Sequence, residues 1–149
     1  MSEGTPGGAP EAVGEELDEA ECLRLVAGQE IGRIAYYGRF GPTVLPVNYR
    51  LFEGSVVFRT GAGSPMDEDL RTGIEDAEYV IAFEVDEFEA GLREGWSVLI
   101  QGSAHHVTSE QERAAVVRAA VSPWAGGPKD AYLRIRPNRV TGRRLSHPG

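Results

Sequence analysis

Polar side chains that suit a phosphate gather around one loop of this 149-residue sequence. Arg59 and Thr60 end an apolar run, and Ser64 follows shortly after them, behind two glycines. A guanidinium, hydroxyl groups and the free N–H groups at the start of a helix are all suitable ligands for a phosphate. The alternative is that Arg59 forms a salt bridge at the rim of the fold and that Ser64 only caps a helix. Spacing alone favours this alternative.

The remaining motifs indicate little catalytic chemistry. His105 and His106 are adjacent on a predicted strand, so their side chains point to opposite faces and cannot bind one metal ion together. We expect no metal site, and a lone cysteine, Cys22, excludes an internal disulfide. The segment around Ser97 lacks the second glycine of a nucleophile elbow, which weakens a serine hydrolase hypothesis. The catalytic residues are therefore unknown, with His105 only a weak candidate.

The net charge of −8 comes mainly from the N-terminal segment. The first 21 residues hold seven acidic residues and no Lys or Arg, and the rest of the chain is close to neutral. A near-neutral body argues against nucleic-acid binding, although the last 21 residues include five arginines. No apolar run reaches the roughly 18–20 residues that span a bilayer. We expect a cytoplasmic protein without a nucleic-acid or membrane partner.

The length of the chain suits one domain with one core. We expect a disordered tail, acidic and rich in Gly and Pro, over residues 1–16, and a single domain over residues 17–149. Capping signals predict three short helices. The first covers residues 19–27, the second begins at Ser64-Pro65, and the third covers residues 109–121.

Between the helices the apolar period changes from 3.6 to 2, which predicts a mainly β fold. The predicted strands cover residues 31–37, 42–52, 55–60, 79–85, 96–107 and 131–136, with a further extended segment over 140–145. Short turns join the first three strands into an antiparallel meander. Pro46 marks an edge or a bulge, and Gly102 marks a bend in a long strand. We expect a small antiparallel barrel with helices at its ends.

The ordered region resembles the pyridoxamine 5'-phosphate oxidase-like, flavin-binding split-barrel family, and is closest to its small actinobacterial-type members. The resemblance rests on an ordered set of short motifs, none of them diagnostic alone. They are ECLRL (21–25), IGRIA (31–35), PVNY (46–49), VFRTGAGS (57–64), FEVD (83–86), GWSVLIQGSA (95–104), PWAGG (123–127) and VTGRR (140–144).

The resemblance implies a six-stranded split β-barrel that forms a homodimer, with a flavin, FMN, at each end of the subunit interface. It implies an oxidoreductase acting on an unknown small molecule, in which the cofactor performs the redox step. The residues that it places at the cofactor are Leu45, Pro46, Val47 and Asn48 along the ring, Arg59, Thr60 and Ser64 at the phosphate, and Trp96 and Ser97, across the interface. The alternative for Trp96 is an ordinary core residue.

One departure from the family pattern concerns the residues after Ser64. The family commonly has Lys or Arg there, whereas this chain has Pro65 and Met66 and then three acids, Asp67, Glu68 and Asp69. Three carboxylates in one turn would repel a phosphate. This leaves open a deazaflavin (coenzyme F-420)-dependent reductase, a non-catalytic flavin-, haem- or small-ligand-binding protein, a chain that retains no cofactor, and an interaction domain. The arginines needed for vitamin B6 oxidation are not found.

Overall fold

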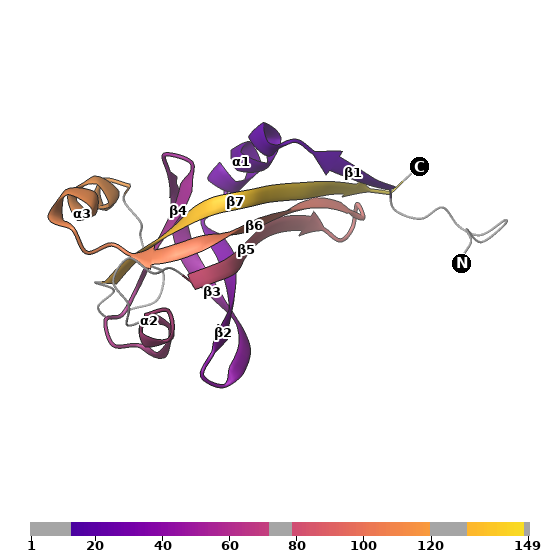
Figure 1. The fold of residues 1–149 in the computed structure, drawn as a ribbon. Coiled ribbons are helices and arrows are strands. Elements are labelled where there is room, and N and C mark those ends of the chain that lie inside the picture. The colour runs from indigo at the N-terminus through magenta and orange to yellow at the C-terminus, as the bar shows by residue number, and fades with distance from the viewer. Residues whose placement is uncertain (1–12, 72–78, 120–130, 148–149) are drawn as a thin grey trace.

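The computed structural model describes residues 13–71, 79–119 and 131–147. In chain order, and as labelled in Figure 1, its elements are β1 (Val13–Leu17), α1 (Glu19–Ala27), β2 (Ile31–Gly38), β3 (Gly41–Phe52), β4 (Ser55–Thr60), α2 (Pro65–Asp69), β5 (Tyr79–Glu89), β6 (Glu94–His106), α3 (Glu110–Val117) and β7 (Ala131–Ser146). Residues 1–12 of the predicted tail and the motif at 123–127 lie outside the described residues.

Six strands close into an antiparallel barrel. The pairs run from β2 to β3, β4, β7, β6 and β5, and β5 pairs back with β2. The mainly β, six-stranded barrel predicted from the sequence is therefore confirmed, as is the meander of β2, β3 and β4. Pro46 lies in the part of β3 that pairs with β2 alone, which agrees with its predicted edge position.

Strand β1 is an addition to the barrel that was not predicted. Residues 13–16, expected in the tail, pair with the end of β7, and Figure 1 shows β1 beside that end of the strand. The register sets Glu15 opposite Arg144 and Glu16 opposite Arg143, and opposite charges across two strands favour pairing. The ordered part of the domain therefore begins before Leu17.

Strand β7 is one continuous strand of 16 residues, although Pro137 was expected to end it. The pairing of β6 and β7 shifts register between Gln101 and Gly102, opposite Pro137, and such a bulge accommodates a residue without an N–H. A Cβ on Gly102 would lie 2.1 Å from the carbonyl oxygen of Arg136. The predicted bend at Gly102 is confirmed, and it allows β7 to pass the proline.

Helix α1 packs against the barrel and has the bounds that the sequence predicts. Asp18 caps α1 by accepting from the Glu21 N–H at 2.8 Å, and Cys22 and Val26 of α1 are fully buried. Gly142 of β7 makes room for Cys22, because a Cβ there would lie 2.5 Å from the Cys22 sulfur. Burial raises the pKa of the Cys22 thiol.

Helices α2 and α3 cover other parts of the barrel. Met66 of α2 and its C-cap residue Leu70 join the main core, and Val116 of α3 packs in a second cluster. Helix α3 is capped by Ser109 as predicted, but it ends at Val117 rather than at residue 121. Within the described ranges, no helix is both long and apolar enough to cross a membrane.

Candidate functional site

The loop between β4 and α2 brings together two of the predicted phosphate ligands. The Thr60 and Ser64 hydroxyl oxygens lie 3.0 Å apart and share a hydrogen bond. Ser64 also caps α2, accepting from the Asp67 N–H at 3.2 Å. Gly63 has a φ of +80°, a conformation that glycine adopts without strain. The two hydroxyls are therefore held together at the end of β4 by the local turn.

Asp67 occupies the interior of this loop. Its residue is only 1% exposed, and its carboxylate accepts from the Gly63 N–H at 2.7 Å. The Nε2 atom of His106, on β6, lies 2.7 Å from the same carboxylate, and Arg71 donates to it at 3.3 Å. Burial alone raises the pKa of Asp67, but the Gly63, His106 and Arg71 contacts outweigh it and hold the pKa below its usual range.

The three acids of α2 are not free to face a ligand, which corrects the expectation of a simple repulsive turn. Asp67 points inward, and Asp69 accepts from Nε of Arg39 at 2.6 Å. Glu68 lies 3.5 Å from the same guanidinium. The Gly63 N–H also donates to Asp67, so the hydroxyls of Thr60 and Ser64 are the donors of this loop that face a ligand most directly. Sequence reasoning missed this arrangement because His106 is distant in the chain and Arg39 lies in the hairpin between β2 and β3.

Arg59 directly precedes Thr60 at the end of β4, so the two side chains point to opposite faces of the strand. Its guanidinium carbon sits 5.1 Å from the centre of the Tyr132 ring, and Arg113 lies 4.9 Å from the same ring. The register pairs Arg59 with Tyr132 across β4 and β7. The cation–π contact therefore holds the guanidinium over Tyr132, which packs with Val57 of β4 and Val116 of α3.

The predicted ring-contacting segment lies on β3. Leu45 is 38% exposed and Pro46 is exposed, whereas Val47 is buried. The Asn48 amide donates to the Glu30 carbonyl at 3.4 Å. Leu45 and Pro46 are the members of this segment with surface available for a flat ligand.

Trp96 and Ser97 lie at the opposite end of the barrel from Thr60. Trp96 pairs with Arg144, and Thr60 pairs with Ala131, so most of the length of β7 separates them. At roughly 3.3 Å per residue, this is up to about 40 Å. Trp96 is buried in the core of its own chain. One chain does not bring the two groups together, and their meeting across a dimer interface stays a prediction.

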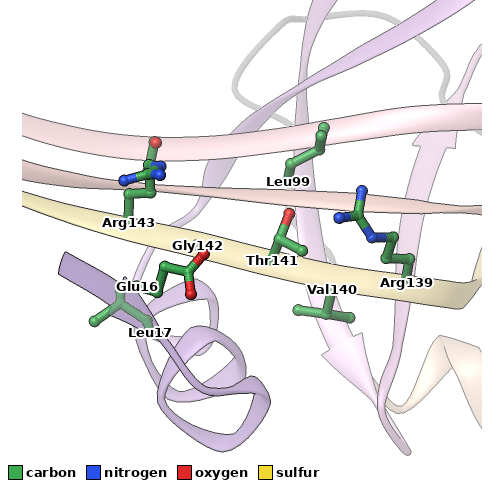
Figure 2. Close-up of a pocket in the computed structure, with 9 residues that line it drawn as sticks. Glu16, Leu17, Leu99, Arg139, Val140, Thr141, Gly142 and Arg143 are labelled. Atoms are coloured by element: carbon green, nitrogen blue, oxygen red, sulfur yellow. The ribbon is translucent and has the colours of Figure 1, made fainter. Parts of the chain in front are cut away.

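A cleft on the outer face of β6 and β7, with a volume of about 490 Å³, contains Ser97. Figure 2 shows its labelled residues, which come from β1, β6 and β7. The lining residues are Glu16, Leu17, Ser97, Leu99, Arg139, Val140, Thr141, Gly142 and Arg143. Sequence reasoning missed this cleft, although the alternation of Arg139, Thr141 and Arg143 on a strand places the three on one face.

A charged trio lies on the adjoining outer face of the barrel. Arg33 of β2 lies 3.2 Å from both Glu84 and Asp86 of β5. Burial and the Asp86 carboxylate raise the pKa of Glu84 to about 7, and Arg33 opposes that shift. Glu84 is therefore a carboxyl group that changes its charge near neutral pH.

The two histidines lie on opposite faces of β6, as predicted. His106 contacts Asp67, whereas Nε2 of His105 lies 2.9 Å from Glu112 of α3. Arg134 bonds to the same Glu112 carboxylate at 3.0 Å. These contacts attach α3 to the barrel, and they give His105 a structural role.

The comparisons with known proteins agree with this architecture. Residues 18–144 match the pyridoxamine 5'-phosphate oxidase family. An uncharacterised protein of Mycobacterium tuberculosis, Rv0080, is 33% identical over 147 residues, covering 97% of this chain and 95% of the relative.

Two solved structures share the fold. The FAD-binding protein from Mycobacterium smegmatis is 28% identical, with a TM-score of 0.73 over 87% of this chain and 98% of that one. A candidate pyridoxamine 5'-phosphate oxidase from Corynebacterium glutamicum is 26% identical, with a TM-score of 0.72 over 91% and 96% of the two chains. The strand pairing, the ordered motifs and these matches lead to one conclusion: the chain belongs to the pyridoxamine 5'-phosphate oxidase family and has its split-barrel fold.

Proposed function

We propose that this protein binds a flavin, FMN, in a homodimer and acts as an oxidoreductase on a small molecule. The observation that carries the proposal is the Thr60–Ser64 hydroxyl pair, at the loop position that the family motif assigns to the cofactor phosphate. The FAD-binding relative at 28% identity supports a flavin in general.

The outer surface of the barrel supports the homodimer. Three large apolar side chains on β2, β3 and β5 are well exposed: Tyr37 at 74%, Val44 at 61% and Val80 at 75%. Phe40, in the hairpin between β2 and β3, is 94% exposed. Apolar surface of this kind is typical of a protein–protein interface, and in a twofold dimer the same patch serves both subunits. A second copy is also what would bring the Trp96–Ser97 segment to a flavin bound near Thr60, with Ser97 as the more accessible of the two because Trp96 packs in its own core.

In this arrangement the chain binds and orients the cofactor. The flavin supplies the transfer of a hydride or of electrons. Leu45 and Pro46 offer an apolar surface for the ring, and Thr60 and Ser64 can both donate to a phosphate if they exchange their mutual hydrogen bond for it. His106 is held against buried Asp67, so we assign it no role in proton transfer.

Titration of the purified protein with FMN, FAD, riboflavin and coenzyme F-420 tests this proposal through flavin fluorescence quenching, followed by turnover assays with reduced nicotinamide. Thr60→Val removes one hydroxyl at nearly constant shape, and we expect it to weaken FMN at least fivefold while riboflavin changes little. Thr43→Val is the matched control, because in the described part of the chain the Thr43 hydroxyl bonds only to the Gly41 carbonyl of its own hairpin.

A colourless protein that quenches none of these compounds would refute flavin binding in every form. Quenching by F-420 alone would replace FMN with the deazaflavin, and binding without turnover would identify a non-catalytic binding protein.

A further inference from the structure

We propose that the cleft between β6, β7 and β1 binds the diphosphate group of a dinucleotide. The link between this cleft and a flavin rests on the proposed function, because Ser97 lines the cleft and is also a predicted flavin contact. The diphosphate site itself is argued from the charges and geometry of the cleft.

Two arginines flank a hydroxyl on one face of β7. Arg139, Thr141 and Arg143 alternate along the strand, and Figure 2 shows their side chains projecting to the same side. Arg139 and Arg143 are four residues apart, or about 13 Å between their Cα atoms. Long guanidinium side chains that start at this spacing can converge on two linked phosphates, each of which favours bidentate hydrogen bonds from arginine.

The arginines of the cleft differ from five other arginines of the protein. Arg33, Arg39, Arg71, Arg134 and Arg144 each form an ion pair with a carboxylate. Among the described residues, by contrast, Arg143 has no acidic partner within ion-pair distance, and Arg139 bonds only to the neutral side chain of Gln101, at 3.2 Å. Neither arginine is engaged in an ion pair with a described residue, and their two charges exceed the single opposing charge of Glu16, which stands across from Arg143 on β1 and also lines the cleft.

The backbone beside the cleft leaves room for Arg143. A Cβ on Gly14 of β1 would lie 2.7 Å from a terminal nitrogen of Arg143, so the guanidinium occupies space that any other residue at position 14 would restrict. Across β6, Ser97 stands opposite Arg143 and Leu99 opposite Thr141. The cleft thus combines two cations, two hydroxyls and one carboxylate with the apolar side chains of Leu17, Leu99 and Val140.

The size and remaining chemistry of the cleft favour a nucleotide over a bare anion. Its volume of about 490 Å³ exceeds what an isolated phosphate needs and falls in the range of ligand pockets. Glu16 also lines the cleft, and a carboxylate accepts hydrogen bonds from ribose hydroxyls, as it does in dinucleotide sites. The same diphosphate chemistry belongs to FAD and to reduced nicotinamide dinucleotides.

Calorimetric titration of the full-length protein with ADP and AMP tests the cleft without any flavin. We expect ADP to bind at least tenfold more tightly than AMP, and the double variant R139Q/R143Q to lose at least tenfold for ADP. Arg118→Gln is the matched control, because Arg118 is an exposed arginine at the end of α3, and it should leave ADP affinity unchanged. Equal affinity for ADP and AMP, no ADP binding, or an unchanged double variant would overturn the proposal.

Titrations with FAD, FMN and NADPH identify the source of the diphosphate. A loss for FAD in R139Q/R143Q with FMN unchanged would assign the cleft to a flavin dinucleotide, and a loss for NADPH alone would assign it to the nicotinamide substrate. If ADP binds through the arginines while no flavin binds at all, the cleft stands and the proposed function fails. If flavins bind and the double variant leaves ADP, FAD and NADPH unchanged, only the cleft proposal fails.

Discussion

Replacement of Asp67 by Ala is expected to destabilise the fold far more than its position in a short surface helix would indicate. The side chain is 2% exposed and accepts from the Gly63 N–H, while His106 and Arg71 pair with its carboxylate. Its removal leaves the His106 ring, which is only 12% exposed, without this partner, and it leaves the Gly63 N–H without its acceptor. Arg71, at 53% exposure, can rehydrate.

The magnitude follows from these three contacts. Loss of a partner that leaves buried polar groups unsatisfied costs about 1–3 kcal/mol, and more where a charged group is involved. Because Asp67 is a buried carboxylate while Arg71 is solvated and contributes little, we expect about 3 kcal/mol for Asp67→Ala. Asp67→Asn keeps an acceptor for Gly63 and should cost less, about 1–2 kcal/mol.

Urea unfolding at neutral pH measures this loss, with Glu68→Ala as the control. Glu68 is the next residue in α2, is 56% exposed, and lies 3.5 Å from Arg39, so its removal should cost less than about 0.5 kcal/mol. The pKa of Asp67 is lowered in the folded protein, so its stabilisation is present above the unfolded value of 3.8 and is lost as the pH falls through the folded value. A cost below about 1 kcal/mol for Asp67→Ala would refute the assigned network.

Three further changes test other parts of the structure. The pKa of Glu84 is raised from 4.5 to about 7, so between these values the folded state binds more protons than the unfolded state and stability should fall as the pH rises. Urea unfolding midpoints measured across this pH range should show that fall in the wild type and lose it in Glu84→Gln. A fall that is unchanged in the variant would contradict the assignment. Gly142→Ala places a Cβ 2.5 Å from the Cys22 sulfur and should lower the free energy of unfolding by about 1–3 kcal/mol, and by less in a Cys22→Ala background. If urea unfolding shows that the losses of the two single variants simply add in the double variant, the clash is excluded. Arg59→Ala should weaken FMN more than riboflavin in fluorescence titrations, whereas equal losses would remove Arg59 from the phosphate.

Elements with local signals could be predicted from the sequence. The helix over 19–27 was found through its cap Asp18, and the strand over 55–60 through its apolar run; both have the predicted bounds. The bend at Gly102 was also predictable, because a glycine inside a long strand indicates a bulge. These features depend on residues that are neighbours in the chain.

Elements that depend on distant residues were not predictable in the same way. Strand β1 exists because β7 offers it a partner more than 100 residues away, and nothing local to Glu15 and Glu16 indicates a strand. The inward turn of Asp67 depends on His106, which is 39 residues away in the sequence. Pro137 reads locally as the end of a strand, but β7 continues past it through a bulge opposite Gln101 and Gly102 of β6. The candidate site differed from expectation at the acids of α2 for this reason.

Sedimentation velocity recorded in the visible absorption of a flavin tests the central claim most directly, because it reports cofactor and assembly together. The account predicts that flavin absorbance sediments with a species of twice the 16.1 kDa chain mass. Flavin absorbance that stays unsedimented, or that moves with the single chain, would contradict a flavin site completed by a second subunit.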